Sequence, residues 1–104
     1  MNNPETSRGQ HRVNSGGRRV LPQGAWRRIE RSLGLSQRGL SIIQSVFDDR
    51  SEPAIARELG ISAHTVHTYL ERLYHRLDVR SRIGLVLRIV AEHLAMSTDR
   101  PTAD

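Results

Sequence analysis

The sequence predicts an all-α protein, with a compact four-helix domain preceded by one extra N-terminal helix. Three observations favour this fold class. Apolar residues recur at intervals of three and four through most of residues 22–96, which is the period of an amphipathic helix. Serines stand just before four of these segments, where N-caps are expected. No segment alternates apolar and polar residues as a half-buried strand does.

The size and composition limit the class of protein. A chain of 104 residues and 11.8 kDa is expected to form one small domain with tails. It has no cysteine, which excludes disulfides and thiolate metal sites. It also has no apolar run of about 20 residues and no signal-peptide pattern, so we expect a cytoplasmic protein with no membrane partner.

The positive charge is concentrated in the first third of the chain. Residues 1–34 contain seven Arg and two Glu, whereas residues 35–104 contain nine Arg and nine Asp or Glu, so the net charge of +5 comes from the first part. Residues 1–21 are polar and Arg-rich, and we expect a disordered arm there, with a second disordered tail at 97–104. Such an arm could attract phosphates, or it could be a soluble leader without a binding role.

The first predicted helix covers residues 22–34. Pro22 suits a helix start, Gly34 suits a helix end, and Trp26, Ile29 and Leu33 share one face. We expect Trp26, the only tryptophan, to pack this helix onto the rest of the core.

The four-helix domain is expected at residues 35–96. Ser36 caps its first helix, which ends near Asp48. Ser51 caps the second, with Pro53 in the first turn, where its missing N–H does no harm. Ser81 caps the fourth, which ends near Met96.

The third helix of the domain carries the most informative pattern. Gly60 ends the helix before it and Ser62 caps it, and two helices joined by so tight a turn form a helix-turn-helix. The residues expected on its buried face are Val66, Leu70, Leu73 and Leu77. The opposite face carries hydrogen-bonding side chains that can read base edges: His64, His67, Thr68, Glu71, Arg72 and His75.

The fourth helix has apolar residues on two faces. The face expected to close the core consists of Ile83, Val86, Leu87, Val90 and Leu94. The second face consists of Leu85, Ile89 and Met96, and we expect it to form a homodimer interface. Alternatively, the extra N-terminal helix covers this second face through Trp26 and Ile29.

One set of residues spread over more than half of the chain forms a recognisable pattern: Leu35, Ser36, Arg38, Ile55, Ala56, Leu59, Gly60, Ile61, Ser62, Thr65, Val66, Thr68, Leu73, Leu77, Val79, Arg80, Ser81 and Arg82. In this pattern the chain resembles the LuxR-type (GerE-like) helix-turn-helix domain of bacterial transcription regulators. The resemblance implies base-edge contacts by His67, Thr68 and Glu71, and dimerisation through the fourth helix. It implies phosphate contacts by Ser62, Thr65, Arg72 and Arg76. Two positions that are often basic in this family are His67 and Glu71 here, and a carboxylate can accept from cytosine N4.

The sequence therefore indicates a sequence-specific regulator of transcription that binds double-stranded DNA with the helix from Ser62 to Leu77 in the major groove. It does not indicate an enzyme, a cofactor or a metal, since His64 and His75 are about 16 Å apart along the helix. The alternative is a protein-interaction adaptor, similar to a sigma-factor domain, that docks on RNA polymerase or another transcription protein.

Overall fold

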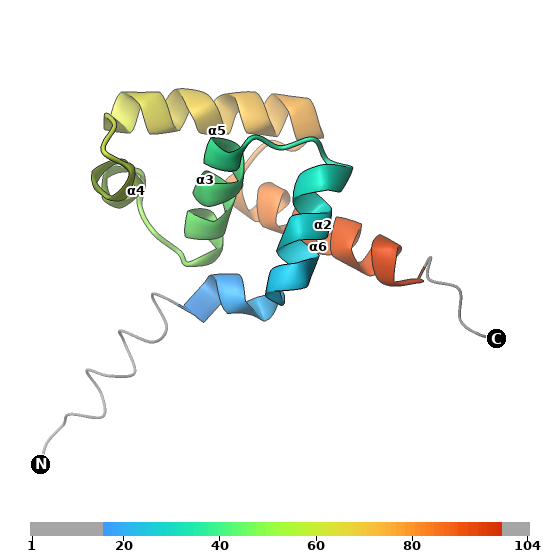
Figure 1. Cartoon of the computed structure of the whole chain (residues 1–104). Coiled ribbons are helices and arrows are strands. Elements are labelled where there is room, and N and C mark those ends of the chain that lie inside the picture. The colour runs from blue at the N-terminus through green and yellow to red at the C-terminus, as the bar shows by residue number, and fades with distance from the viewer. Residues whose placement is uncertain (1–15, 99–104) are drawn as a thin grey trace, which may run out of the picture.

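The computed structural model describes residues 16–98, and every regular element in this range is helical (Figure 1). This confirms the all-α fold class. The elements are the short 3-10 helix η1 (Gly17–Val20) and the α-helices α2 (Gln23–Ser32), α3 (Gln37–Phe47), α4 (Glu52–Leu59), α5 (Ala63–Leu77) and α6 (Arg82–Thr98).

Four helices begin at the serines that the sequence singled out. A Ser side chain at an N-cap accepts from a free N–H of the first turn, which stabilises the helix start by about 1 kcal/mol. The four hydroxyl oxygens accept at 3.0–3.2 Å, Ser36 from Gly39, Ser51 from Ala54, Ser62 from Thr65 and Ser81 from Gly84. The predicted caps are therefore confirmed.

The core lies where α2, α3, α5 and α6 meet, and α5 runs across one side of the molecule (Figure 1). Helix α4 packs mainly against α5. The largest side chains with almost no exposed surface are Ile29, Ile42, Ile43, Ile55, Leu70, Leu85, Ile89 and Val66. Because they come from all five α-helices, α2 is part of the same core as the four-helix domain.

Trp26 joins α2 to α3, as predicted. Its side chain is 3% exposed, and its ring and that of Phe47 form an edge-to-face pair with centroids 4.9 Å apart and planes at 82°. Edge-to-face pairs of this kind contribute about 0.5–1.5 kcal/mol beyond the area they bury. Trp26 is therefore a core residue, and its indole is not available to a partner.

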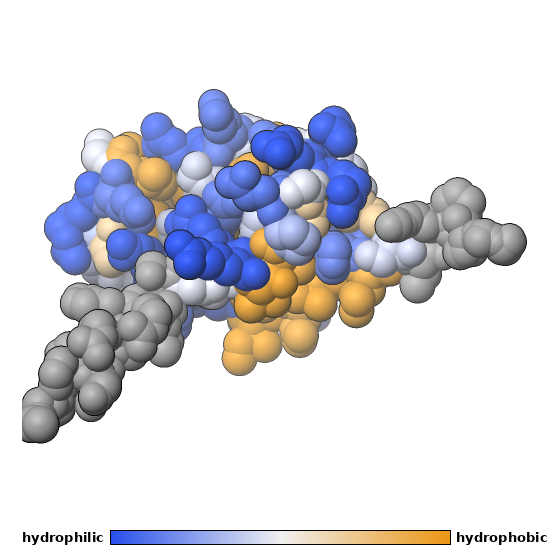
Figure 2. Space-filling view, turned by 60° about the horizontal axis from the view of Figure 1, so that its bottom comes forward, coloured by the Kyte–Doolittle hydropathy of each residue, from blue (hydrophilic) through white to orange (hydrophobic). Residues whose placement is uncertain are grey.

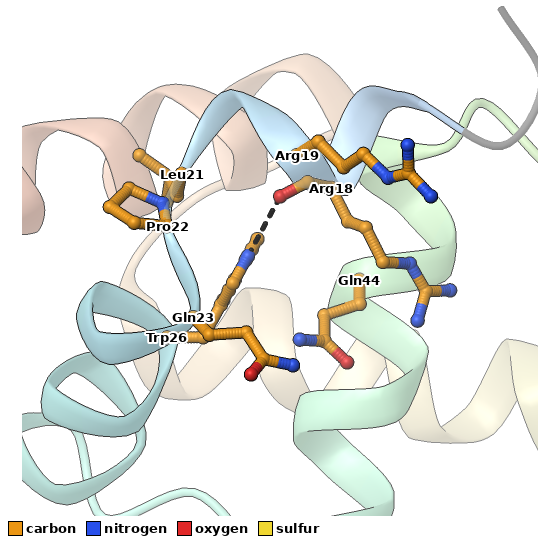
Figure 3. A pocket seen from close by; sticks show the side chains of 7 residues that line it. All are labelled: Arg18, Arg19, Leu21, Pro22, Gln23, Trp26 and Gln44. Atoms are coloured by element: carbon orange, nitrogen blue, oxygen red, sulfur yellow. Dashed lines mark hydrogen bonds between the residues drawn. The ribbon is translucent and has the colours of Figure 1, made fainter. Parts of the chain in front are cut away.

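Residues 16–21 are ordered, so the expected disorder up to residue 21 is wrong for this segment. The Trp26 indole nitrogen donates to the carbonyl oxygen of Arg18 at 2.8 Å, and Leu21 is buried (Figure 3). Arg18 also binds Asp48, which is 30 residues further along the chain. A local reading of the sequence could not find this contact. Residues 1–15 and 99–104 lie outside the described residues, and α6 extends to Thr98, past the expected end of the domain.

A hollow of about 460 Å³ lies beside η1. Figure 3 shows that its walls come from η1, from the start of α2 and from α3. The lining residues are Arg18, Arg19, Leu21, Pro22, Gln23, Trp26 and Gln44.

The two faces of α6 are reversed relative to the prediction for most residues, although Val86, predicted to face the core, is half-buried against it. Leu85 and Ile89, predicted to form the dimer interface, have no exposed surface and lie in the core of the single chain. Met96, the third predicted interface residue, is half-buried against the same core. Helix α2 packs against α6 and contributes Ile29 to the same buried cluster, which is the alternative stated above. The proposed interface on Leu85, Ile89 and Met96 is therefore wrong.

The other face of α6 is exposed instead. Ile83, Leu87 and Leu94 are 72%, 63% and 58% exposed, and their spacing of four and seven residues puts them on one stripe. Figure 2 shows most of the hydrophobic surface along the lower side of this view and a smaller hydrophobic patch at its upper left, with hydrophilic surface over most of the rest. Beside the start of this stripe lies a hollow of about 300 Å³, lined by Val46, Asp49, Arg82, Ile83, Val86 and Leu87.

Within residues 16–98, none of the helices is long and apolar enough to cross a membrane.

Candidate nucleic-acid interface

Helices α4 and α5 form a helix-turn-helix. Helix α4 ends at Gly60, whose backbone is left-handed (φ 70°, ψ 33°), a conformation that glycine adopts without a steric penalty. The N–H of Ile61 donates to the carbonyl of Ala56 at 3.0 Å, and Ser62 then caps α5. The turn thus holds the start of α5 at a fixed angle to α4.

Helix α5 is anchored by the predicted apolar stripe. Val66, Leu70, Leu73 and Leu77 are all buried, so this prediction is confirmed. The opposite face is polar and open to solvent. Its exposed side chains are His64, Thr65, His67, Glu71, Arg72, His75 and Arg76, with Ser62 exposed at the cap and Thr68 half-buried. The structure therefore brings all nine predicted DNA-binding residues onto the exposed side of one helix and its cap.

One edge of this face is acidic. The Nδ1 atom of His67 lies 3.4 Å from the Oε2 atom of Glu52 at the start of α4, and its Nε2 atom lies 3.8 Å from the Oε2 atom of Glu71. The His67 side chain is 55% exposed, so these contacts lie at the surface. The sequence did not indicate Glu52, because 15 residues separate it from His67 and only the turn brings them together.

Tyr74 lies on the same edge, and the charged side chains there affect the pKa of its hydroxyl. Partial burial raises the pKa of its hydroxyl above the ordinary value of 10.0, and the carboxylates of Glu52 and Glu71 raise it further, while Arg82 opposes them. The phenol therefore stays protonated near neutral pH and remains a hydrogen-bond donor.

The other edge of the face is basic. A hollow of about 320 Å³ lies between the start of α3 and α5, and the hydroxyls of Ser36 and Tyr69 are 3.1 Å apart in its wall. Arg72 lines this hollow, and no described residue accepts a hydrogen bond from its guanidinium. The full lining is Gly34, Ser36, Gly39, Tyr69, Arg72, Leu73 and Arg76. A guanidinium here can bind a phosphate oxygen.

Two arginines connect the helices around this face through hydrogen bonds to backbone carbonyls. The Arg76 guanidinium donates to the carbonyls of Leu33 and Gly34, which follow the last residue of α2. Arg82 donates to the carbonyl of Arg50, between α3 and α4. This contact fastens the start of α6 to the loop between α3 and α4. Arg80 is exposed.

The three histidines on this face do not form a metal site. Within residues 16–98, no group of three or more His, Asp or Glu side chains is arranged to hold a metal ion.

The fold and this face define a helix-turn-helix protein whose second helix presents a polar surface for recognition. Residues 33–89 match the family model described as "Bacterial regulatory proteins, luxR family". The match covers 57 of the 104 residues, and the chain belongs to this family. The extra helix α2 lies entirely before the matched region.

Two curated relatives match part of the chain. Both are named "Probable transcriptional regulatory protein NarL", from the CDC 1551 / Oshkosh and ATCC 25618 / H37Rv strains of Mycobacterium tuberculosis. Each is 35% identical over 60 residues, which is 58% of this chain and 28% of the relative. The similarity therefore concerns little more than a quarter of those proteins. No solved structure matches the chain at a significant level.

Proposed function

We propose that this chain is a transcription regulator that binds specific sequences of double-stranded DNA by inserting α5 into the major groove. The observation that carries the proposal is the two-sided character of α5, with four apolar residues in the core and a continuous polar face in solvent. A major groove about 12 Å wide admits an α-helix, and base edges there offer donors and acceptors to side chains of this kind. Membership of a family of bacterial regulatory proteins supports the same function.

Each part of the face has a role in this proposal. His67, Thr68 and Glu71 contact base edges, and the exposed side chains of His64 and His75 extend the same face.

The phosphate contacts lie at the basic edge and at the helix start. Arg72 binds phosphate at the basic edge, together with Ser62 and Thr65 at the helix start. The Arg76 guanidinium donates to the carbonyls of Leu33 and Gly34 through one nitrogen. Its other N–H groups make the phosphate contact.

The regulator acts as a homodimer, and the exposed stripe of α6 is the contact. Ile83, Leu87 and Leu94 are large apolar residues in solvent on a single helical face. Pairing this face with its copy across a two-fold axis removes it from water in both chains. A symmetric dimer reads an inverted repeat, with one α5 in each half-site.

DNA binding is tested by mixing the full-length protein with genomic DNA fragments at physiological salt and sequencing the retained DNA. A shared palindromic motif is expected. Thr68→Ala should weaken binding to that motif by about 5-fold or more, and Arg72→Ala should weaken binding to all sequences and reduce its salt dependence. Arg27→Ala removes an exposed arginine from α2 and is the matched control. Retention without a motif, or full affinity in both α5 variants, contradicts the proposal.

The dimer is tested by the mass in solution. Light scattering should give twice the chain mass of 11.8 kDa for the wild type and a single chain for Leu87→Glu, which puts a charge in the stripe. Gln23→Glu adds the same charge on α2 and should leave the mass unchanged. A wild-type protein with the mass of one chain contradicts the dimer.

The adaptor function has one specific observation in its favour. The same apolar stripe on α6 could dock on RNA polymerase or another transcription protein instead of a second copy. Docking through the helix around Trp26 is not favoured, because the indole is buried. Under the adaptor function, the protein retains no DNA motif and has the mass of one chain.

A further inference from the structure

We propose that α5 selects bases with an amino group in the major groove, cytosine or adenine, at two successive positions of one DNA strand. Glu71 and His67 read these amino groups, and Glu52 acts as a positioning residue that fixes the proton on His67. The inference rests on the proposed DNA-binding function and adds the chemistry of recognition to it.

The first step concerns the proton on His67. An ionised carboxylate only accepts hydrogen bonds, so an imidazole nitrogen that is hydrogen-bonded to it must carry hydrogen. The Nδ1 atom lies within hydrogen-bond distance of the Oε2 atom of Glu52, at 3.4 Å, whereas Nε2 lies 3.8 Å from the Oε2 atom of Glu71, which is too far for a hydrogen bond. In the neutral ring only one nitrogen is protonated, so Nε2 then holds a lone pair. His67 thereby presents an acceptor at its outer nitrogen.

The second step concerns the neighbour of that nitrogen. The Glu71 side chain is 60% exposed, one turn further along α5, and its Oε2 atom lies 3.8 Å from the Nε2 atom of His67. Its carboxylate also only accepts. These two exposed groups are therefore two acceptors side by side, with no lysine or arginine between them on the helix.

The third step concerns the bases. In the major groove, cytosine N4 and adenine N6 donate, whereas guanine O6 and thymine O4 accept. An acceptor placed against a keto oxygen loses its hydration without gaining a hydrogen bond, which is unfavourable. The two protein acceptors therefore favour amino bases and disfavour keto bases on the strand that they face.

The spacing suggests two bases and not one. Successive bases along one strand are separated by about 3.4 Å of helix rise, which is close to the 3.8 Å between the two acceptors. A paired amino base has one free N–H in the major groove, because its other N–H is used in the base pair. Each acceptor therefore requires an amino base of its own.

The decisive experiment is a selection from random double-stranded DNA at pH 8.0, where histidine side chains are ordinarily neutral. The full-length wild type should enrich a motif in which two adjacent positions of one strand contain cytosine or adenine about 5-fold or more over guanine and thymine. Glu71→Gln should lose this preference at one position, because an amide both donates and accepts. Glu52→Gln should lose it at the other position, because an amide no longer fixes the His67 proton.

Glu30→Gln is the matched control, since it removes the same charge from α2, outside the helix-turn-helix. It should retain both preferences. A role of Glu52 that was only structural would lower affinity for every sequence and would leave the base preference unchanged.

A second measurement removes the amino group itself. In the selected duplex, purine replaces adenine, or 2-pyrimidinone replaces cytosine, at each of the two positions. Wild-type affinity should fall about 5- to 100-fold. For Glu71→Gln the loss should be smaller at the position assigned to Glu71.

The outcomes separate the two proposals. A motif without the adjacent amino bases, or one whose preference survives in both Glu71→Gln and Glu52→Gln, overturns this inference and leaves the DNA-binding function standing. No motif with any variant overturns the DNA-binding function, and the inference falls with it.

Discussion

Asp48 binds Arg18 at two points, and both hydrogen bonds are 2.7 Å long. One carboxylate oxygen accepts from the backbone N–H of Arg18, and the other accepts from the Nε of its guanidinium. The Asp48 side chain is 5% exposed, and this residue also caps the end of α3. The pair therefore fastens η1 to α3, on the side of α3 away from α5 (Figure 1).

Replacing this carboxylate should lower stability without affecting the reading face. We expect Asp48→Asn to reduce the free energy of unfolding by about 1–3 kcal/mol, because the amide group turns a donor toward Arg18. Urea unfolding measures the change. Asp49→Asn is the control at the next position, where the side chain is exposed and Asn tolerates the left-handed backbone (φ 62°). Equal stability of the two variants would contradict the role of Asp48.

Gly17 provides a second test of the same attachment. A Cβ atom at this position would lie 1.5 Å from the carbonyl oxygen of Phe47, and backbone cannot move aside as a flexible side chain can. Gly17→Ala should therefore displace η1 and lower the free energy of unfolding by about 1–3 kcal/mol. Gly16→Ala adds the same methyl group where nothing lies within 4 Å, and it should have little effect. If Gly17→Ala unfolds at the same urea concentration as Gly16→Ala, η1 does not pack on α3 as described.

The two faces of α6 should respond in opposite ways to shortening. Leu85→Ala removes buried side-chain atoms and should cost about 2–5 kcal/mol of unfolding free energy. Leu87→Ala acts on a 63% exposed side chain and should cost less than about 0.5 kcal/mol within one chain. Unfolding of both variants in an Ile83→Glu background, which also puts a charge in the exposed stripe and which we expect to be monomeric, removes any contribution from dimerisation. A larger cost for Leu87→Ala than for Leu85→Ala would reverse the assignment of the faces.

The contact between α2 and α6 should make stability depend on pH. Hydrogen bonds from Ser32 and then from Arg88 hold the pKa of Glu92 below its ordinary value of 4.5. The folded state therefore favours the ionised carboxylate. Its stabilising contribution is fully present above pH 4.5 and is lost as the pH falls through the lower folded pKa.

Urea unfolding between pH 7 and pH 3 measures this dependence. The free energy of unfolding should fall less steeply below pH 4.5 in Glu92→Gln than in the wild type, and Ser32→Ala should have an intermediate slope. Glu30→Gln is the matched control, because it removes a carboxylate of α2 to which no described residue donates a hydrogen bond. Equal slopes in wild type and Glu92→Gln would show that Glu92 is not linked to folding.

The parts of the fold that the sequence predicted correctly are governed by local interactions. A serine cap acts on an N–H three residues away, so Ser36, Ser51, Ser62 and Ser81 could be recognised without tertiary information. The buried stripe of α5 was equally clear, because only one side of that helix is apolar.

The parts that the sequence missed depend on distant residues. Helix α6 is apolar on two sides, so its pattern could not decide which side Leu85 and Leu87 occupy. That choice depends on α2, which packs against α6 and shares one buried cluster with Leu85 and Ile89. In the same way, the order of η1 depends on Asp48, and the contact between Glu52 and His67 depends on the helix-turn-helix angle.

The position of the single tryptophan gives this protein an internal optical reporter. Trp26 is buried, hydrogen-bonded to η1 and in contact with α3, so its fluorescence should change when the N-terminal segment detaches. No tryptophan lies on α5, so DNA bound there would not contact the indole directly. The emission of the unlabelled protein can thus follow the attachment of η1 and α2 while DNA binding is measured with a label on the DNA.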